Sequence, residues 1–271
     1  MLKQRVLTGV GLTFGIAAIL LLSGYSWLLK AVAVTVSLAA AYELCRAGGY
    51  LRQKAFVFGT MAAAVLFALL GSPKLAGILL LAVLIGAICL MRQIGSRKTV
   101  PEWVILLAAS GSAYFFGLLT QIRAQENGFF LLTTVILIPV ITDIGAFFFG
   151  KRFGKHKLAP VISPKKTWEG AVGGTASTVA LLALAAWILE QTGFVQMNMR
   201  YWVNYLLLAS CISQMGDLSF SAIKRISGIK DYGTLLPGHG GILDRFDSLL
   251  VVIPFTVWIT QRFGPLIASA C

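Results

Sequence analysis

The chain has 271 residues, of which 58% are hydrophobic and 12% are charged, and its mean hydropathy is +0.84. Because soluble domains carry about 25% charged residues, this composition excludes an ordinary soluble protein and indicates one embedded in a membrane. The net charge of +13 requires no nucleic-acid partner, since basic residues also gather beside the anionic lipids of a cytoplasmic leaflet. The four cysteines lack the spacing of metal ligands, so we expect them to fill apolar positions.

About nine apolar runs follow one another along the chain, each long enough or nearly long enough to cross a membrane as a helix. The runs are residues 6–22, 27–47, 56–70, 75–91, 103–119, 129–149, 171–189, 202–220 and 246–260. They predict an all-α integral membrane protein with about nine transmembrane helices.

The basic residues orient this predicted bundle. With the N-terminus in the cytoplasm, most of the 23 lysines and arginines fall in cytoplasmic segments. The basic residues outside are then Lys30, Lys74, Arg123, Arg200 and Arg262. The positive-inside rule therefore predicts a cytoplasmic N-terminus and an external C-terminus.

The first part of the chain, residues 1–125, holds almost no ionisable side chain within its apolar runs. We expect this region, with about five spans, to be a transmembrane scaffold that also forms a homodimer interface, since its glycines and alanines suit close helix packing. Glu43 is the exception, near the cytoplasmic end of the second run. We expect Glu43 to pair with Arg46 at the membrane surface, and a functional role is the alternative.

Asp143 lies within the otherwise apolar run 129–149, four residues after Pro139. A carboxylate at the bilayer centre costs about 2.5–3.5 kcal/mol on insertion scales, and a proline removes a backbone hydrogen bond. A helix broken here has to line a cavity or be buried in protein. The alternative is an aspartate that bonds to neighbouring threonine side chains.

A second aspartate, Asp217, lies in the run 202–220. At 1.5 Å per residue, Asp143 and Asp217 lie about 21 Å and 24 Å from the outer ends of their runs. Asp244, at the cytoplasmic start of the last run, lies close to the same depth. We therefore expect the three aspartates to converge near the cytoplasmic surface.

The segment SPKKTWEG begins with Ser163 and Pro164. These residue types are typical of the N-cap and the first helical position, so we expect a helix to start at Ser163, with Lys165 and Lys166 in its first turn. Cations there oppose the helix dipole, and a bound anion would remove that conflict. The alternative is that both lysines follow the positive-inside rule, with Trp168 as an interfacial anchor.

The segment 221–247, SAIKRISGIKDYGTLLPGHGGILDRFD, concentrates both signs of charge between two apolar runs. With glycines around a histidine and a proline that stops a helix, it is typical of a folded polar site rather than of a linker. It resembles the signature of the phosphatidate cytidylyltransferase family, and the SPKKTWEG segment resembles that family as well. The matching residues of the signature are Ser221, Lys224, Arg225, Lys230, Asp231, Pro237, His239, Gly240, Gly241, Asp244, Arg245 and Asp247.

This resemblance implies an integral membrane enzyme of phospholipid biosynthesis, in which phosphatidate attacks the α-phosphorus of CTP and gives CDP-diacylglycerol and pyrophosphate. The catalytic region would then be residues 126–271, with about four spans and the cytoplasmic loops 150–170 and 221–247. We expect the protein in a bacterial inner membrane, with anionic lipid around it and the active site facing the cytoplasm.

Carboxylates ringed by lysines and arginines suit Mg²⁺, which binds through a few carboxylates and substrate phosphates. Zinc is not indicated, because the chain has only two histidines and no cysteine accompanies them. We predict that Asp217 and Asp244 hold Mg²⁺, with Asp143 or Asp247 as a further ligand or as a partner of the ligands. A second cation is an open alternative.

The predicted site residues fall into two sets. The predicted catalytic residues are Asp217, Lys224, Arg225, His239, Asp244 and Asp247. The predicted substrate-binding residues are Lys165, Lys166, Ser221, Lys230, Asp231, Gly240, Gly241 and Arg245. Basic members would clamp phosphates, and the glycines would let backbone amides approach a phosphate. Two roles stay open: His239 transfers a proton or bonds within the loop, and Lys230 binds substrate or pairs with Asp231.

Two other classes of protein are alternatives. A transporter of an anionic substrate would also place charges and a broken helix in a membrane, although its site would lie nearer the midplane. Another lipid-phosphate enzyme, such as a polyprenol kinase or a CDP-alcohol phosphotransferase, is the second alternative. Formation of a nucleotide-lipid product from CTP and phosphatidate would exclude both.

Overall fold

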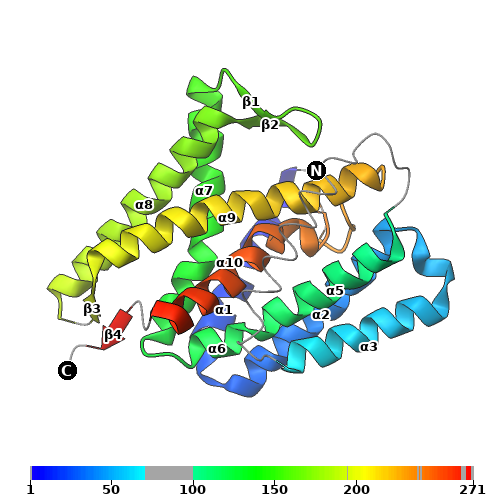
Figure 1. Cartoon of the computed structure of the whole chain (residues 1–271), viewed down its shortest axis with the longest axis horizontal. Coiled ribbons are helices and arrows are strands. Elements are labelled where there is room, and N and C mark those ends of the chain that lie inside the picture. The colour runs from blue at the N-terminus through cyan, green and yellow to red at the C-terminus, as the bar shows by residue number, and fades with distance from the viewer. Residues whose placement is uncertain are drawn as a thin grey trace.

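The structure is a computed structural model that describes residues 2–70, 100–193, 195–236, 238, 240–263 and 267–269. Its N-terminal group of elements consists of α1 (Leu2–Leu21), the 3₁₀ turn η1 (Leu22–Gly24), α2 (Ser26–Ala47), the 3₁₀ turn η2 (Tyr50–Arg52), α3 (Lys54–Leu70), α5 (Glu102–Gly117) and α6 (Leu119–Arg123). Its C-terminal group consists of α7 (Gly128–Phe153), β1 (Lys157–Ala159), β2 (Ser163–Thr167), α8 (Trp168–Gln191), β3 (Val195–Met197), α9 (Met199–Ile226), α10 (Leu243–Phe263) and β4 (Ile267–Ser269). Helix α10 joins the groups, because it packs against α5 and α6 on one side and against α7 and α9 on the other (Figure 1).

Helices occupy every predicted span that falls within the described residues, whereas the predicted span 75–91 lies outside them. Within the described part of the chain, five helices are long and apolar enough to cross a membrane, namely Ser26–Ala47, Glu102–Arg123, Gly128–Phe153, Trp168–Gln191 and Met199–Ile226. Two shorter apolar helices are Thr8–Gly24 and Lys54–Leu70. The mainly helical, membrane-suited character that the composition predicts is therefore confirmed.

Helix α7 packs more extensively against α8 than against any other described element. A Cβ on Gly145 would lie 2.7 Å from a side-chain oxygen of α8, and one on Gly174 would lie 2.5 Å from the carbonyl oxygen of Thr142. Glycine at these positions lets the two backbones approach closely. Thr142 Oγ1 also lies 2.8 Å from Thr178 Oγ1 and 2.9 Å from Ser210 Oγ. Hydroxyl groups thus join α7, α8 and α9 at one level.

Helix α7 is continuous although Pro139 lies inside it, so the break expected at this proline is not formed. Pro139 is buried, and the carbonyl that it leaves without a donor therefore stays inside the protein. Among the described residues, Asp143 shares no hydrogen bond with a threonine. Its neighbour Thr142 donates to the Ile138 carbonyl at 2.7 Å instead. Asp143 is thus left to interact with groups beyond its own helix.

In the N-terminal group, α2, α3 and α5 pack against one another through small side chains. A Cβ on Gly117 would lie 2.3 Å from the Ala68 carbonyl oxygen, so α5 and α3 touch backbone to backbone. On α2, Ala40 and Leu44 are completely buried. Glu43 lies between them in sequence and is also buried, at 1% exposure, which makes it a carboxylate inside an apolar core.

Two small antiparallel sheets, β1 with β2 and β3 with β4, accompany the helices. The β1–β2 hairpin connects α7 to α8 and extends sideways from the end of that helix pair (Figure 1). The all-α prediction missed these strands. They are short, and the β1–β2 hairpin lies in a segment rich in lysine, where hydropathy carries no signal for a strand.

Candidate active site

The β1–β2 hairpin brings Lys166 toward α9. The segment predicted to start a helix at Ser163 forms strand β2 instead, and α8 begins at Trp168, so that prediction is wrong. The N-cap is Thr167, whose Oγ1 accepts a hydrogen bond from the Gly170 N–H at 3.1 Å. Pairing with β1 satisfies backbone groups of this segment, and it also keeps two lysines out of a first helical turn, where they would oppose the helix dipole.

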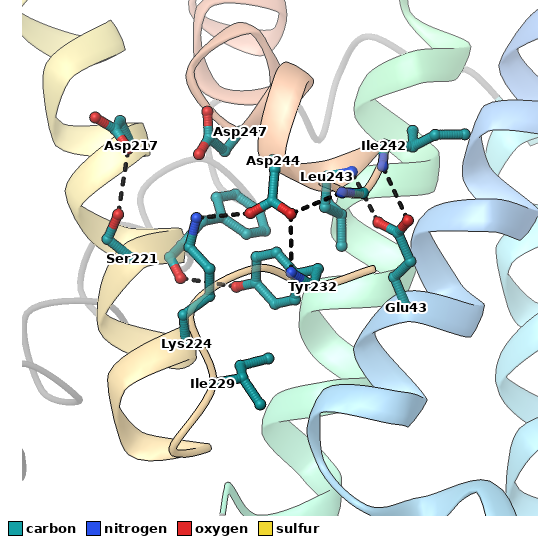
Figure 2. A network of polar contacts seen from close by, with 12 residues as sticks. Glu43, Asp217, Ser221, Lys224, Ile229, Tyr232, Ile242, Leu243, Asp244 and Asp247 are labelled. Carbon is teal, nitrogen blue, oxygen red and sulfur yellow. Dashed lines mark hydrogen bonds and ion pairs between the residues drawn. The ribbon is translucent and has the colours of Figure 1, made fainter. Parts of the chain in front are cut away.

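Lys166 forms an ion pair with Asp217 of α9, and each side chain is 23% exposed. One turn further along α9, Ser221 donates from its hydroxyl to Asp217 Oδ1 at 3.2 Å (Figure 2). Three predicted site residues from two distant segments therefore meet at this point. Asp217 holds the Lys166 ammonium in place while part of both side chains stays open to ligands.

A pocket of about 180 Å³ lies beside this ion pair. Its lining includes Asp143, Phe147, Lys165, Lys166 and Gln214. The volume is below the range of about 300–1,000 Å³ found for sites that enclose a whole small molecule, so the pocket fits part of a substrate. Two ammonium groups and one carboxylate at its wall favour a phosphate group accompanied by a cation.

The signature loop, residues 227–242, folds around Asp244 in the first turn of α10 (Figure 2). Asp244 Oδ1 accepts a hydrogen bond from Lys224 Nζ at 2.8 Å. Asp244 Oδ2 accepts from the backbone N–H groups of Tyr232 and Gly241, at 2.8 and 2.9 Å. The Asp244 side chain is 4% exposed. Both of its oxygens are engaged within the protein, so Asp244 organises the loop and fixes the Lys224 ammonium.

Tyr232 anchors the middle of the signature loop. Its side chain is buried, at 1% exposure, and its hydroxyl donates to the Phe220 carbonyl at 2.7 Å. Lys224 Nζ lies 5.3 Å from the centre of the tyrosine ring, within the range of a cation–π interaction. Burial, with the negative charges of nearby carboxylates, raises the pKa of the Tyr232 hydroxyl well above its usual value. The hydroxyl therefore stays protonated and keeps its hydrogen bond.

Glu43 is a residue of the site for which the sequence indicated a functional role only as the alternative. Its carboxylate reaches from α2 to the start of α10, where Oε1 accepts from the Ile242 N–H and Oε2 from the Leu243 N–H, both at 2.9 Å (Figure 2). The expected surface pairing with Arg46 is wrong, since the ion pairs found among the described residues do not include it. A helix N-terminus stabilises a negative charge. The usable signal was a lone carboxylate in an apolar run.

Asp143, Asp217 and Asp247 form an acidic cluster contributed by α7, α9 and α10. They lie close enough for their negative charges to repel one another. Asp247 is 7% exposed, so water screens its charge poorly. The cations that act on members of the cluster are Lys166, Lys224 and Arg245. These cations offset part of the repulsion.

The acidic cluster offers the hard oxygen ligands that Mg²⁺ prefers. In the described part of the chain, no three histidine, cysteine, aspartate or glutamate side chains are grouped closely enough to hold a metal ion. Mg²⁺ does not need such a group, because it commonly binds through one or two carboxylates, waters and substrate phosphates. Carboxylates that repel one another in a protein interior fit this cation. Asp217 has partners at both oxygens, Ser221 and Lys166, but its side chain is 23% exposed. Asp244 is 4% exposed and bonded to two backbone N–H groups, so it fits this cation less well.

Other predicted site residues lie around this centre. Arg225 is exposed, and its Nε donates to a carbonyl group of the β1–β2 hairpin at 2.9 Å. Lys230 and Asp231 are exposed on the signature loop, and no ion pair joins them among the described residues. Gly240 has a φ of +83°, which only glycine adopts readily. His239 lies outside the described residues.

Known proteins resemble this chain over much of its length. The family model described as "Cytidylyltransferase family" matches residues 3–263. Proteins named phosphatidate cytidylyltransferase from Staphylococcus aureus (strain COL), Haemophilus influenzae and Staphylococcus haemolyticus are 46%, 42% and 40% identical over 135, 129 and 146 residues. These alignments cover 49%, 48% and 53% of this chain and 49%, 45% and 52% of the relatives. The chain thus spans about half the length of the curated relatives it matches, and, by the family model, it belongs to the cytidylyltransferase family.

Proposed function

We propose that this protein is a phosphatidate cytidylyltransferase, which transfers the cytidylyl group of CTP to phosphatidate and releases pyrophosphate. The observation that carries the proposal is the meeting of the acidic cluster with three cations at one end of long apolar helices. Joining a membrane lipid to a nucleotide requires a polyanion site and a lipid-accessible helix bundle in one protein. The names of the curated relatives support the choice of substrates.

In the proposed reaction, a phosphate oxygen of phosphatidate attacks the α-phosphorus of CTP, and the bond from that phosphorus to the pyrophosphate oxygen breaks. A phosphate monoester has its second pKa near 6, so it is mostly dianionic at pH 7 and needs no strong base. The main obstacle is repulsion between two polyanions, which positioned cations reduce. The ammonium groups of Lys165 and Lys166 at the pocket wall would hold one of the phosphates.

Asp217 and Asp247, with Asp143 beside them, would hold Mg²⁺. When bound, Mg²⁺ supplies positive charge at the phosphates and aligns them. In this proposal Asp244 fixes Lys224 and the signature loop, and the sequence-based expectation that it also binds Mg²⁺ stays a prediction. Lys224 then presents its charge at a constant position. Asp217 also orients Lys166 through their ion pair.

The membrane arrangement belongs to the same proposal. About nine spans, a cytoplasmic N-terminus and an external C-terminus would place the active site at the cytoplasmic face of a bacterial plasma membrane, and the protein would form a homodimer. The distribution of basic residues supports this orientation. Labelling of cysteines introduced at Ser163 and at Asn198 tests it, because the two should react from opposite sides.

The deciding experiment is turnover by the protein purified in detergent, where no compartments exist. With CTP, phosphatidate and Mg²⁺ together, CDP-diacylglycerol and pyrophosphate should appear in equal amounts, and omission of any one component should stop both. A transporter would bind a substrate without forming a product. A lipid kinase would release a nucleoside diphosphate and no CDP-lipid. Either result would overturn the proposal.

A further inference from the structure

Glu43 belongs to the N-terminal group of helices, yet its carboxylate is bonded at the entrance of α10 (Figure 2). A buried carboxylate is costly unless its oxygens are hydrogen-bonded. Here each oxygen accepts one backbone N–H, from Ile242 and from Leu243, at 2.9 Å. Two N–H donors directed at the two oxygens favour the ionised side chain, because hydrogen bonds to a carboxylate stabilise its charge. The first N–H groups of a helix have no partner within the helix, and the two oxygens of Glu43 serve as their acceptors here.

Two glycines of the signature loop are explained by Glu43. A Cβ on Gly241 would lie 2.4 Å from Glu43 Oε1, and a Cβ on Gly233 would lie 2.6 Å from the same oxygen. Among the described residues, Gly240 is in the positive-φ region, but Gly233 and Gly241 are not. Other residues could therefore adopt the backbone conformation of Gly233 and Gly241. A side chain at either position would have to push the Glu43 carboxylate away from its bonds to the start of α10.

Glu43 and Asp244 hold the same stretch of chain. The Gly241 N–H donates to Asp244, and the next two N–H groups along the chain donate to Glu43. The Tyr232 N–H, next to Gly233 in sequence, donates to the same Asp244 oxygen as Gly241. The path of the signature loop and the first turn of α10 are thus set jointly by these two carboxylates.

We propose that Glu43 is a positioning residue of the active site, a fixed carboxylate on α2 that sets where α10 begins and thereby where Asp244 and Asp247 lie. Glu43 itself touches no substrate. The inference rests on the proposed function and makes the N-terminal group of helices part of the catalytic apparatus rather than a scaffold alone. A misplaced active site loses transition-state stabilisation more than substrate binding, so kcat should fall more than the KM for CTP rises.

The first test is Glu43→Gln, which keeps the size of the side chain but places an NH₂ group against one of the two N–H donors. We expect kcat to fall about 10²-fold, because a small misplacement of active-site groups lowers the rate by about this factor. The KM for CTP should change little. Hydrogen exchange at the Ile242 and Leu243 amides should become faster. Glu126→Gln is the matched control, because Glu126 is an exposed carboxylate. Wild-type kcat together with wild-type exchange in Glu43→Gln would overturn the proposal.

The second test keeps Glu43 and changes its neighbour. Gly233→Ala brings a methyl group against the carboxylate and should lower kcat in the wild-type chain. In a Glu43→Ala chain, which leaves that space empty, Gly233→Ala should cost little more. If the losses of kcat in Glu43→Ala and Gly233→Ala simply add in the double variant, the two residues do not act through their contact, and the proposal is contradicted. Since Gly233→Ala needs no change at Glu43, wild-type turnover in this single variant would overturn the proposal even if the Glu43 variants fail to fold.

The two proposals fail in distinguishable ways. If the wild-type protein forms no CDP-diacylglycerol, the proposed function is wrong. The exchange measurement on Glu43→Gln needs no substrate, so it still decides whether Glu43 holds the start of α10.

Discussion

Two groups of carboxylates lie near one end of the molecule and are held in opposite ways. Glu43 and Asp244 have both oxygens bonded to backbone N–H groups or to a lysine. Asp143, Asp217 and Asp247 instead lie near one another among cations, and Asp217 is held by side chains, those of Ser221 and Lys166. The carboxylates of the first group accept hydrogen bonds that hold the signature loop and the start of α10 in place. The second group keeps negative charge available for a ligand.

Asp244 and Asp247 belong to different groups although they lie three residues apart. Both belong to the family signature and both lie in the first turns of α10. Asp244 accepts from Lys224 and from two N–H groups of the signature loop. Asp247 Oδ1 accepts from the Ser248 N–H at 2.7 Å and from the Ser248 hydroxyl at 3.4 Å, and Asp217, Lys224 and Asp143 lie near enough to act on its charge. Membership of a signature therefore identifies a site, whereas the surrounding donors distinguish the role of each residue.

The largest expected effect is that of Asp244→Asn. Asn accepts through one oxygen only, and its NH₂ group would face either Lys224 or the N–H groups of the loop. Removing one partner of a buried ion pair costs about 3–5 kcal/mol of unfolding free energy. We therefore expect the Tm in detergent and the turnover to fall together. Glu126→Gln, which removes an exposed carboxylate, should change neither. A normal Tm in Asp244→Asn would move Asp244 into the second group.

Asp217→Asn should separate activity from stability. Asn keeps the size of the side chain and loses the half-screened ion pair with Lys166, but loss of the charge also relieves repulsion within the acidic cluster, so Tm should fall much less than in Asp244→Asn. Turnover should fall about 10²- to 10³-fold, the size of effect seen when one electrostatic contact to a transition state is lost. Added Mg²⁺ should restore part of it. A drop in Tm as large as that in Asp244→Asn would remove the contrast between the two groups.

Local pattern was enough for the helices and for part of the site. A membrane permits few backbone arrangements other than a helix, so the run predicted at 27–47 matches α2 (Ser26–Ala47) closely. Asp143 and Asp217 could be placed at one depth because a helix rises by a constant amount per residue. Their electrostatic interaction in the structure agrees with that placement.

Partners that the residue pattern of one segment does not reveal, some of them far along the chain, account for what the sequence analysis missed. Glu43 bonds to the Leu243 N–H, 200 positions later in the chain, and no local feature of α2 names that partner. Ser163 has the local features of a helix start, but pairing between β1 and β2 overrides them. The engagement of Asp244 likewise depends on how the signature loop folds back on α10. In each case a partner outside the residue's own segment decided the outcome.

The smallest expected effect is that of Arg225→Ala. Arg225 is exposed, and its Nε donates to the Ile162 carbonyl at 2.9 Å, so it ties the β1–β2 hairpin to α9 from outside the acidic cluster. One hydrogen bond contributes about 0.5–1.5 kcal/mol to stability, so the loss of turnover should be no more than about 10-fold. The hairpin should also become more sensitive to proteolysis, because its link to α9 is weakened. Lys155→Ala, which removes another exposed cation near the hairpin, should leave both measurements unchanged.

If Arg225 instead clamps a phosphate, the loss of turnover should match that of Asp217→Asn and the KM for CTP should rise, while proteolysis of the hairpin stays the same. Kinetics and proteolysis on one preparation therefore place Arg225 either with the residues that hold the chain or with those that meet the substrate.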